Sequence, residues 1–213
     1  MDNTINFNVS DILHSMTSGD LDDRGMSWEY CFDFFQDKVL SNKNYDEQYA
    51  SLMLGFYLAS WGMYRGSSQL LQRYTYTIHN EAIKTILINR DNAQECYSKL
   101  SQYYKSKEVS PTDTLITKIM LGVLGNVSAY DRFFIDGLRI FNKKFNLKLK
   151  YSFSYDNFIE VVKVMKNEDI INQIGDIESV SLKTISKKDV PLAKKIDMYF
   201  WKLGILANEL ILK

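Results

Sequence analysis

Residues 46–68 read DEQYASLMLGFYLASWGMYRGSS, and this stretch decides the fold. No charged residue occurs from Gln48 to Tyr64, whereas Asp46 and Glu47 stand just before this run, where the N-terminal end of a helix favours acidic side chains. Large apolar residues fall on nearly every side of the helix that the pattern predicts, which is typical of a helix enclosed by others. The run is slightly short for a membrane span and contains polar side chains, so we expect a buried core helix in a soluble protein.

Small residues form a second stripe along the same helix, at Ser51, Gly55, Ala59 and Gly62. Glycine inside a helix costs about 1 kcal/mol relative to alanine, so two glycines in one helix need a compensating reason. Two interpretations are open: a neighbouring backbone packs closely against this stripe, or a ligand approaches it.

The remaining chain repeats the helical pattern, with apolar residues at three- and four-residue steps. Only 2 proline and 10 glycine residues interrupt the sequence, too few for the closely spaced turns of an all-β domain. The stretch 146–153 alternates like a strand, but a single strand has no partner, so we expect an extended loop there. The expected helices cover residues 28–40, 69–88 with a break near 74–78, 93–105, 112–124 and 128–141, with two more beginning at 154 and 191.

Residues with preferences for helix ends set the expected boundaries. Ser110 and Pro111 predict a helix with serine as its N-cap and proline at its first position. Gly125 predicts the C-terminal end of that helix. Other serines that we expect to begin helices are Ser27, Ser128 and Ser154.

These features predict an all-α fold, a single-domain irregular helical bundle of about seven to nine helices spanning residues 1–213. Residues 48–64 and 112–124 are expected at its centre. Residues 1–25 form a polar N-terminal segment, and residues 167–190, polar and broken, are expected to be flexible or dependent on a partner. We find no internal repeat and no linker that would divide the chain.

Composition narrows the class of protein. Apolar residues make up 46% of the chain and aromatic residues 14%, which excludes disorder as the dominant state. The 26 basic and 26 acidic residues cancel, so the net charge does not support nucleic-acid binding. Cys31 and Cys96 lie in apolar helical patterns, as expected of reduced, buried thiols in a cytoplasmic protein. Abundant Asn, Lys, Ile and Tyr are typical of AT-rich genes of bacteria and their phages.

The sequence contains no motif that names a reaction. It has no HExxH, no paired cysteine and histidine spacing for a metal, no glycine-rich dinucleotide loop and no GxSxG turn. It also lacks a secretory signal at its N-terminus. We therefore expect no metal, no cofactor and no membrane attachment, and we assign no catalytic set from these motifs.

A candidate ligand-binding site lies where the central helix ends. Arg65, Gly66, Ser67 and Ser68 follow Trp61 at an expected helix-to-helix junction. Backbone N–H groups at a helix start attract anions, and an arginine adds a bidentate donor, so a phosphate or nucleotide-like anion is the expected ligand. The alternative is structural: the serines cap a helix and Arg65 pairs with an internal carboxylate.

Tyr130, Asp131 and Arg132 form the second candidate site, just after an expected helix end. Asp131 is a candidate for the internal carboxylate that pairs with Arg65. Such a pair would either orient two helices or line a pocket, and both interpretations are open because buried ion pairs are costly and not automatically stabilising.

Arg73 and His79 carry a third pattern. The segment RYTYTIH, residues 73–79, resembles the R-x4-6-H motif of HEPN ribonucleases, a family of small all-α toxins and defence nucleases. The resemblance implies that Arg73 and His79 contact the scissile phosphate and act on the ribose hydroxyl. It covers only these seven residues, and Tyr74 stands where the family usually has a polar residue. The alternative is a partly exposed histidine on a helix.

For function, the sequence favours a non-enzymatic binding protein whose partner is a protein or a nucleotide-like anion. Tyrosine and tryptophan, both abundant here, are enriched at contact surfaces. A HEPN-like ribonuclease or another defence-type enzyme acting on RNA or nucleotides is the second hypothesis. The third is a structural subunit of a homo-oligomer or larger complex, docking through residues 167–190.

Overall fold

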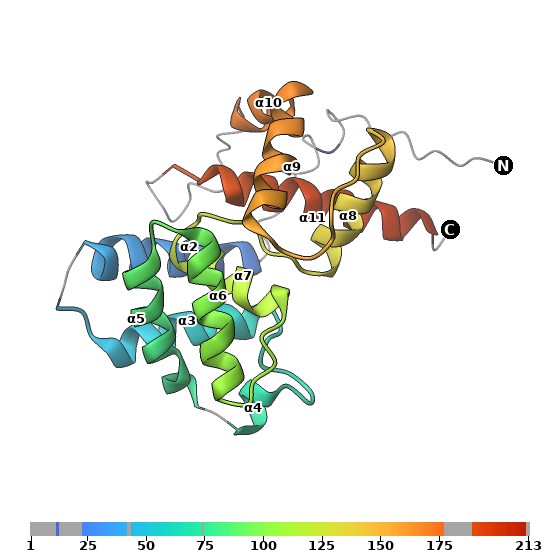
Figure 1. The fold of residues 1–213 in the computed structure, drawn as a ribbon. Coiled ribbons are helices and arrows are strands. Elements are labelled where there is room, and N and C mark those ends of the chain that lie inside the picture. The colour runs from blue at the N-terminus through green and yellow to red at the C-terminus, as the bar shows by residue number, and fades with distance from the viewer. Residues whose placement is uncertain (1–11, 13–22, 42–43, 74, 177–188, 212–213) are drawn as a thin grey trace.

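The structure is a computed structural model that describes residues 12, 23–41, 44–73, 75–176 and 189–211. Within these ranges the chain forms ten α-helices, two short helices of other types and no strand (Figure 1), so the predicted all-α class is confirmed and the predicted helix count is too low. The elements are α2 (Asp23–Phe34), the π-helical η1 (Phe35–Leu40), α3 (Glu47–Ser60), α4 (Gln69–Arg73), the 3-10 helix η2 (Tyr76–Ile78), α5 (His79–Asn89), α6 (Ala93–Ser106), α7 (Asp113–Val123), α8 (Arg132–Lys144), α9 (Tyr155–Asn167), α10 (Ile170–Asp176) and α11 (Leu192–Ile211).

Helix α7 is the centre of the molecule. It packs against α2, α3 and α6, and every residue from Leu115 to Val123 is buried. In the view of Figure 1, α8–α11 lie above the group formed by α2–α7. The prediction that residues 112–124 lie at the centre is therefore confirmed.

Helix α3 forms as predicted, but it is not enclosed on nearly every side. Asp46 is its N-cap and accepts a hydrogen bond from Tyr49 N at 3.0 Å. Ala50, Leu54 and other core residues of α3 are buried, whereas Tyr49 is 50% exposed and Phe56 is 63% exposed. These two residues stand seven positions apart, on one side of the helix. An apolar pattern without charges does not reveal that one side of α3 stays exposed, with no helix of the described ranges covering it.

The stripe of small residues has two different roles. Gly55 is buried, and a Cβ placed there would lie 3.2 Å from Tyr76 Cβ, so η2 packs closely against α3 at this point. Gly62 lies beyond the helix with φ +77°, a conformation that glycine adopts without strain. Close packing therefore explains Gly55, and chain reversal explains Gly62.

Several expected helix starts are displaced by a few residues. Thr112, not Ser110, caps α7 by accepting a hydrogen bond from Leu115 N, and Asp131, not Ser128, caps α8 through Phe134 N. Helix α2 begins at Asp23 rather than after Ser27. In each case more than one residue near the boundary can cap a helix, and tertiary packing selects among them.

Other boundaries agree with the sequence. Ser154 caps α9, accepting a hydrogen bond from Asn157 N, and Gly125 ends α7 with φ +64°. The break expected within 69–88 separates α4, η2 and α5. Residues 146–153 form no strand.

The polar N-terminal segment 1–25 and the segment 167–190 are described only in part. Ile12 is buried, and the rest of residues 1–22 lies outside the described residues. Within 167–190, residues 170–176 form α10, with Ile170 and Ile174 buried. Residues 177–188 lie outside the described part. None of the helices in the described ranges combines the length and apolar character needed to span a membrane.

Candidate functional site

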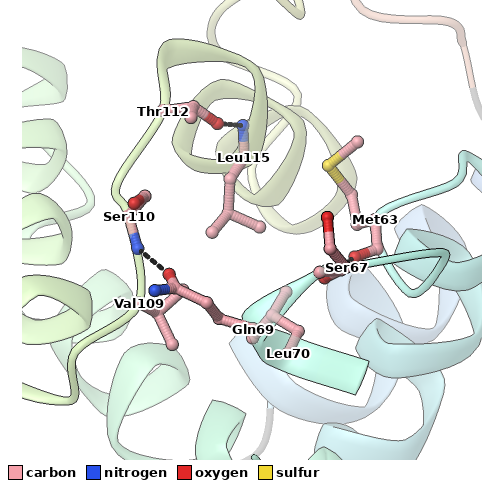
Figure 2. A pocket seen from close by; sticks show the side chains of 9 residues that line it. Met63, Ser67, Gln69, Leu70, Val109, Ser110, Thr112 and Leu115 are labelled. Atoms are coloured by element: carbon pink, nitrogen blue, oxygen red, sulfur yellow. Dashed lines mark hydrogen bonds between the residues drawn. The ribbon is translucent and has the colours of Figure 1, made fainter. Parts of the chain in front are cut away.

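A surface pocket of about 360 Å³ opens beside the end of α3, between two segments that are distant in sequence (Figure 2). The segment 63–70 forms one wall and the segment 109–115 forms the other. The lining consists of Met63, Ser67, Ser68, Gln69, Leu70, Val109, Ser110, Thr112 and Leu115. The predicted residues Ser67 and Ser68 therefore line a pocket, and the opposite wall was not predicted.

The local sequence explains how this pocket forms. Gly62 and Gly66 both have positive φ, +77° and +57°, and reverse the chain after α3. Ser68 Oγ donates a hydrogen bond of 2.5 Å to the Met63 carbonyl oxygen, which closes the turn. Gln69 Oε1 accepts a hydrogen bond of 2.7 Å from Ser110 N, and Figure 2 shows this bond joining the two walls.

The chemistry of the lining favours neutral groups. Four lining residues are aliphatic or thioether side chains, and the other five carry hydroxyl or amide groups, with no charged residue among them. Arg65, the expected anion ligand, is not part of the lining. Its side chain is exposed and lies over Gly62. The anion site expected around Arg65, Gly66 and the two serines is thus divided between the pocket wall and an exposed turn.

The second predicted site is divided in a similar way. Tyr130 is fully buried, where its ring packs against Phe134 and Phe153. Arg132 is exposed and its Nε lies 3.8 Å from Asp136 Oδ2. Asp131 pairs with Lys118, at 2.9 Å between Oδ2 and Nζ, and not with Arg65. The internal carboxylate exists, but its partner is a lysine of the central helix.

Two ion pairs meet around the indole ring of Trp61, and we call them the ion-pair cluster: Lys118 with Asp131, and Lys194 with Asp197. The Lys118 ammonium lies 4.3 Å from the ring centroid of Trp61, and the Lys194 ammonium lies 5.3 Å from it. Cation–π attraction between an ammonium and an indole is strongest where water is excluded. Both lysines are almost fully buried, so each charge has a carboxylate and an aromatic face in place of water.

The ion-pair cluster joins elements that are far apart in the chain. Asp197 Oδ1 accepts a hydrogen bond of 2.9 Å from Ala129 N, which ties α11 to the loop before α8. Asp131 both caps α8 and pairs with α7. Because each charge is paired within the ion-pair cluster, the cluster has a structural role and holds α7, α11 and the start of α8 together. The sequence carried one signal for it: Lys118 is the only charged residue between Asp113 and Asp131.

Glu29 is a buried carboxyl group that was not among the candidate site residues predicted from the sequence. Neither of its oxygens has a hydrogen-bond partner, and the residue is almost fully buried in α2. Burial raises the pKa of Glu29 to about 7, with a smaller contribution from Asp33, while the Lys194 ammonium acts in the opposite direction. Near neutral pH this side chain is therefore partly protonated.

The histidine of the HEPN-like pattern is a core residue. His79 Nε2 and the Tyr64 hydroxyl lie 2.6 Å apart, and His79 Nδ1 and the Tyr104 hydroxyl also lie 2.6 Å apart. The side chain is fully buried, and burial lowers its pKa to about 3. The alternative of a partly exposed histidine is therefore wrong. Arg73 is exposed and pairs with Glu108 at 2.7 Å, so neither ring nitrogen of His79 nor the Arg73 guanidinium is free for a phosphate in this arrangement.

The buried His79 leads to a pH-dependent stability. Between pH 6.5, its ordinary pKa, and about 3, the unfolded chain binds a proton at this residue and the folded chain does not. Stability should therefore fall as the pH falls through this window, by up to about 1.4 kcal/mol per pH unit. Urea unfolding at several pH values should show a steeper loss for the natural chain than for His79→Gln, which does not titrate. Parallel pH profiles for the two proteins would contradict this assignment.

The exposed side of α3 belongs to a larger aromatic surface, which we define by Tyr30, Tyr49, Phe56 and Tyr76. Tyr30 is 55% exposed on α2, and Tyr76, 38% exposed on η2, packs with its Cβ close to Gly55 of α3. The ring of Phe34 on α2 contacts the ring of Tyr49 on α3 at 5.2 Å between centroids. The aromatic surface thus crosses α2, α3 and η2. The sequence predicts a helix that contains Tyr49 and Phe56, but it does not indicate that this side of α3 is exposed.

No protein family model, no curated protein and no solved structure matches this chain. Among the described residues, no group of three or more His, Cys, Asp or Glu side chains could hold a metal ion. Cys31 and Cys96 are free and buried, as expected from the sequence.

Proposed function

We propose that this chain is a binding protein and that its partner is another protein, which docks on the aromatic surface. The observation that carries the proposal is the exposure of three large aromatic side chains, Tyr30, Tyr49 and Phe56, each at least half exposed on two adjacent helices. Clustered exposed apolar groups on a folded domain mark interaction sites, and single scattered ones do not.

Residue chemistry supports a protein partner. Tyrosine and phenylalanine supply large contact areas with few side-chain rotors to immobilise, which makes them frequent anchors of protein interfaces. Met53, half-buried between Tyr49 and Phe56 on the same side of α3, adds a flexible thioether to the surface. From Gln48 to Tyr64 no charged side chain needs to be desolvated when a partner binds.

The other hypotheses receive less support from the same residues. A nucleotide-like anion would need cations beside its binding groups, but no charged side chain lines the pocket at 63–70 and 109–115. An enzyme using Arg73 and His79 would need both groups accessible, but tyrosine hydroxyls contact both nitrogens of His79.

Site-specific photo-crosslinking tests the proposal. A benzophenone amino acid at position 56, introduced in the cell of origin, should give a discrete crosslinked product whose second component is one protein. The control is the same amino acid at Ile88, which is 82% exposed on α5 and lies outside the aromatic surface. The same product at both positions, or none at position 56, would refute the proposal.

A further inference from the structure

The pocket between residues 63–70 and 109–115 has an apolar floor. Leu70, Val109 and Leu115 line it although each is at most 4% exposed, and Figure 2 shows the Leu115 side chain pointing into the space between the two walls. The pocket volume of about 360 Å³ lies within the usual range of small-molecule sites, about 300–1,000 Å³. Because a cavity of about 150 Å³ already holds benzene, this pocket has room for an apolar group of that size.

The polar groups of the lining are mainly hydrogen-bond donors. Gln69 Oε1 already accepts a hydrogen bond of 2.7 Å from Ser110 N, so this amide offers its Nε2 group. Thr112 Oγ1 accepts a hydrogen bond of 3.2 Å from Leu115 N, and its hydroxyl hydrogen can be donated to another acceptor. Ser67 and Ser110 add two hydroxyl groups, which donate or accept. A molecule that presents acceptor oxygens therefore complements this lining.

A neutral molecule fits this pocket better than a charged one. None of the nine lining residues carries a charge. Arg65 belongs to the first segment, but its side chain lies over Gly62 and outside the lining. An ion that enters the pocket would lose hydration, and hydroxyl and amide groups without an opposite charge replace that hydration only in part.

Both walls of the pocket are anchored to one buried hydrogen-bond chain. Tyr64, which follows Met63 of the first wall, has its hydroxyl 2.6 Å from His79 Nε2. His79 Nδ1 lies 2.6 Å from the Tyr104 hydroxyl, and the Tyr104 carbonyl oxygen accepts a hydrogen bond of 2.9 Å from Val109 N of the second wall. Because the walls are fixed before a ligand enters, binding has little ordering of the site to offset.

We infer that this pocket is a binding site for a neutral small molecule that combines an apolar group with a carbonyl or hydroxyl oxygen. The apolar group lies against Leu70 and Leu115, and the oxygen accepts hydrogen bonds from Gln69 Nε2 and the neighbouring hydroxyl groups. None of the lining residues belongs to the aromatic surface, so this inference is independent of the proposed function.

Three probes of similar size test the inference. Acetophenone is neutral and has a carbonyl oxygen, benzoate is an anion, and benzylamine is a cation at neutral pH. In NMR titrations of the isotope-labelled full chain, acetophenone should shift the amide signals of Gln69, Ser110 and Leu115 with a Kd on the order of 1 mM. Benzoate and benzylamine should bind at least about tenfold more weakly, because their charges have no partner in the lining.

Two variants relate the binding to the pocket. Ser67 is exposed, so Ser67→Trp should leave the fold intact, fill the space with a ring and abolish acetophenone binding. Gln69→Glu keeps an oxygen for the Ser110 N–H and replaces the Nε2 donor with a carboxylate oxygen, so it should weaken binding at least about tenfold. The matched control is Gln102→Glu, at an exposed position of α6 outside the lining, which should leave the Kd unchanged.

Four results would overturn the inference. They are no shift of the pocket signals with acetophenone, shifts confined to residues outside the pocket, benzoate or benzylamine binding as tightly as acetophenone, and an unchanged Kd in Ser67→Trp or Gln69→Glu. The photo-crosslink at position 56 does not depend on any of these results, so failure of the pocket and failure of the proposed function are distinguishable.

Discussion

Replacing Gly137 with alanine should destabilise the fold by about 3 kcal/mol, at the upper end of the usual cost of forcing an extra methyl group into a packed contact. Gly137 lies on α8 where that helix crosses α11, and a Cβ there would overlap the Phe200 carbonyl oxygen. The contact is reciprocal, because a Cβ at Gly204 on α11 would overlap the Phe133 carbonyl oxygen. Backbone cannot move aside as a flexible side chain can, so the two helices would have to separate and lose their mutual burial.

Urea unfolding measures the effect of Gly137→Ala, and Gly175→Ala is a matched control. Gly175 lies in α10, its φ is not positive, and a Cβ there would contact nothing within 4 Å. Alanine in an open helical position should be neutral or stabilising by up to about 1 kcal/mol. A similar small effect at both glycines would show that the crossing of α8 and α11 is looser than described.

These glycines illustrate what the sequence could not predict. The pattern singled out Gly55 and Gly62 because they interrupt the most apolar stretch, yet the closest helix crossing lies at Gly137 and Gly204. Periodicity identifies which residues face inward on one helix, but not which second helix arrives or how closely. The pairing of α8 with α11 is a long-range property, separated in sequence by α9 and α10.

The helices themselves were predictable because their signals are local. The break between α4 and α5, the caps at Asp46 and Ser154 and the end of α7 at Gly125 all follow from residues within a few positions. The open side of α3 was not predictable, because whether a helix face is covered depends on the other elements.

The candidate sites show the same division between local and long-range information. Ser67 and Ser68 were identified and do line a pocket, but the opposite wall at 109–115 comes from a distant segment. Asp131 was a candidate for the carboxylate that pairs with Arg65, and the structure does not contain that pair. The partner was expected to be Arg65 because both flank apolar helices, whereas the structure supplies Lys118 from inside α7. The lone Lys118 in an apolar helix is the feature of the sequence from which this pair could have been predicted.

Replacing Asp131 with alanine should destabilise the fold by about 3–5 kcal/mol, because it leaves the buried Lys118 ammonium without a carboxylate. The same change removes the N-cap of α8, which contributes about 1 kcal/mol of this total. Asp131→Asn keeps an oxygen for the Phe134 N–H and removes the charge, so it should lie between the natural chain and Asp131→Ala. Chemical denaturation of the three proteins measures these differences.

A double-mutant cycle isolates the ion pair from the cap. Lys118→Met alone should be destabilising, because it leaves the Asp131 carboxylate partly buried without its cation. Combined with Asp131→Asn it should cost less than the sum of the two single changes, because each single variant leaves one unpaired charge and the double variant leaves none. Arg65→Ala should change stability by less than about 0.5 kcal/mol, as expected of an exposed residue outside the cluster. Strict additivity of Lys118→Met and Asp131→Asn, or a large loss in Arg65→Ala, would mean that Lys118 is not the residue that holds Asp131.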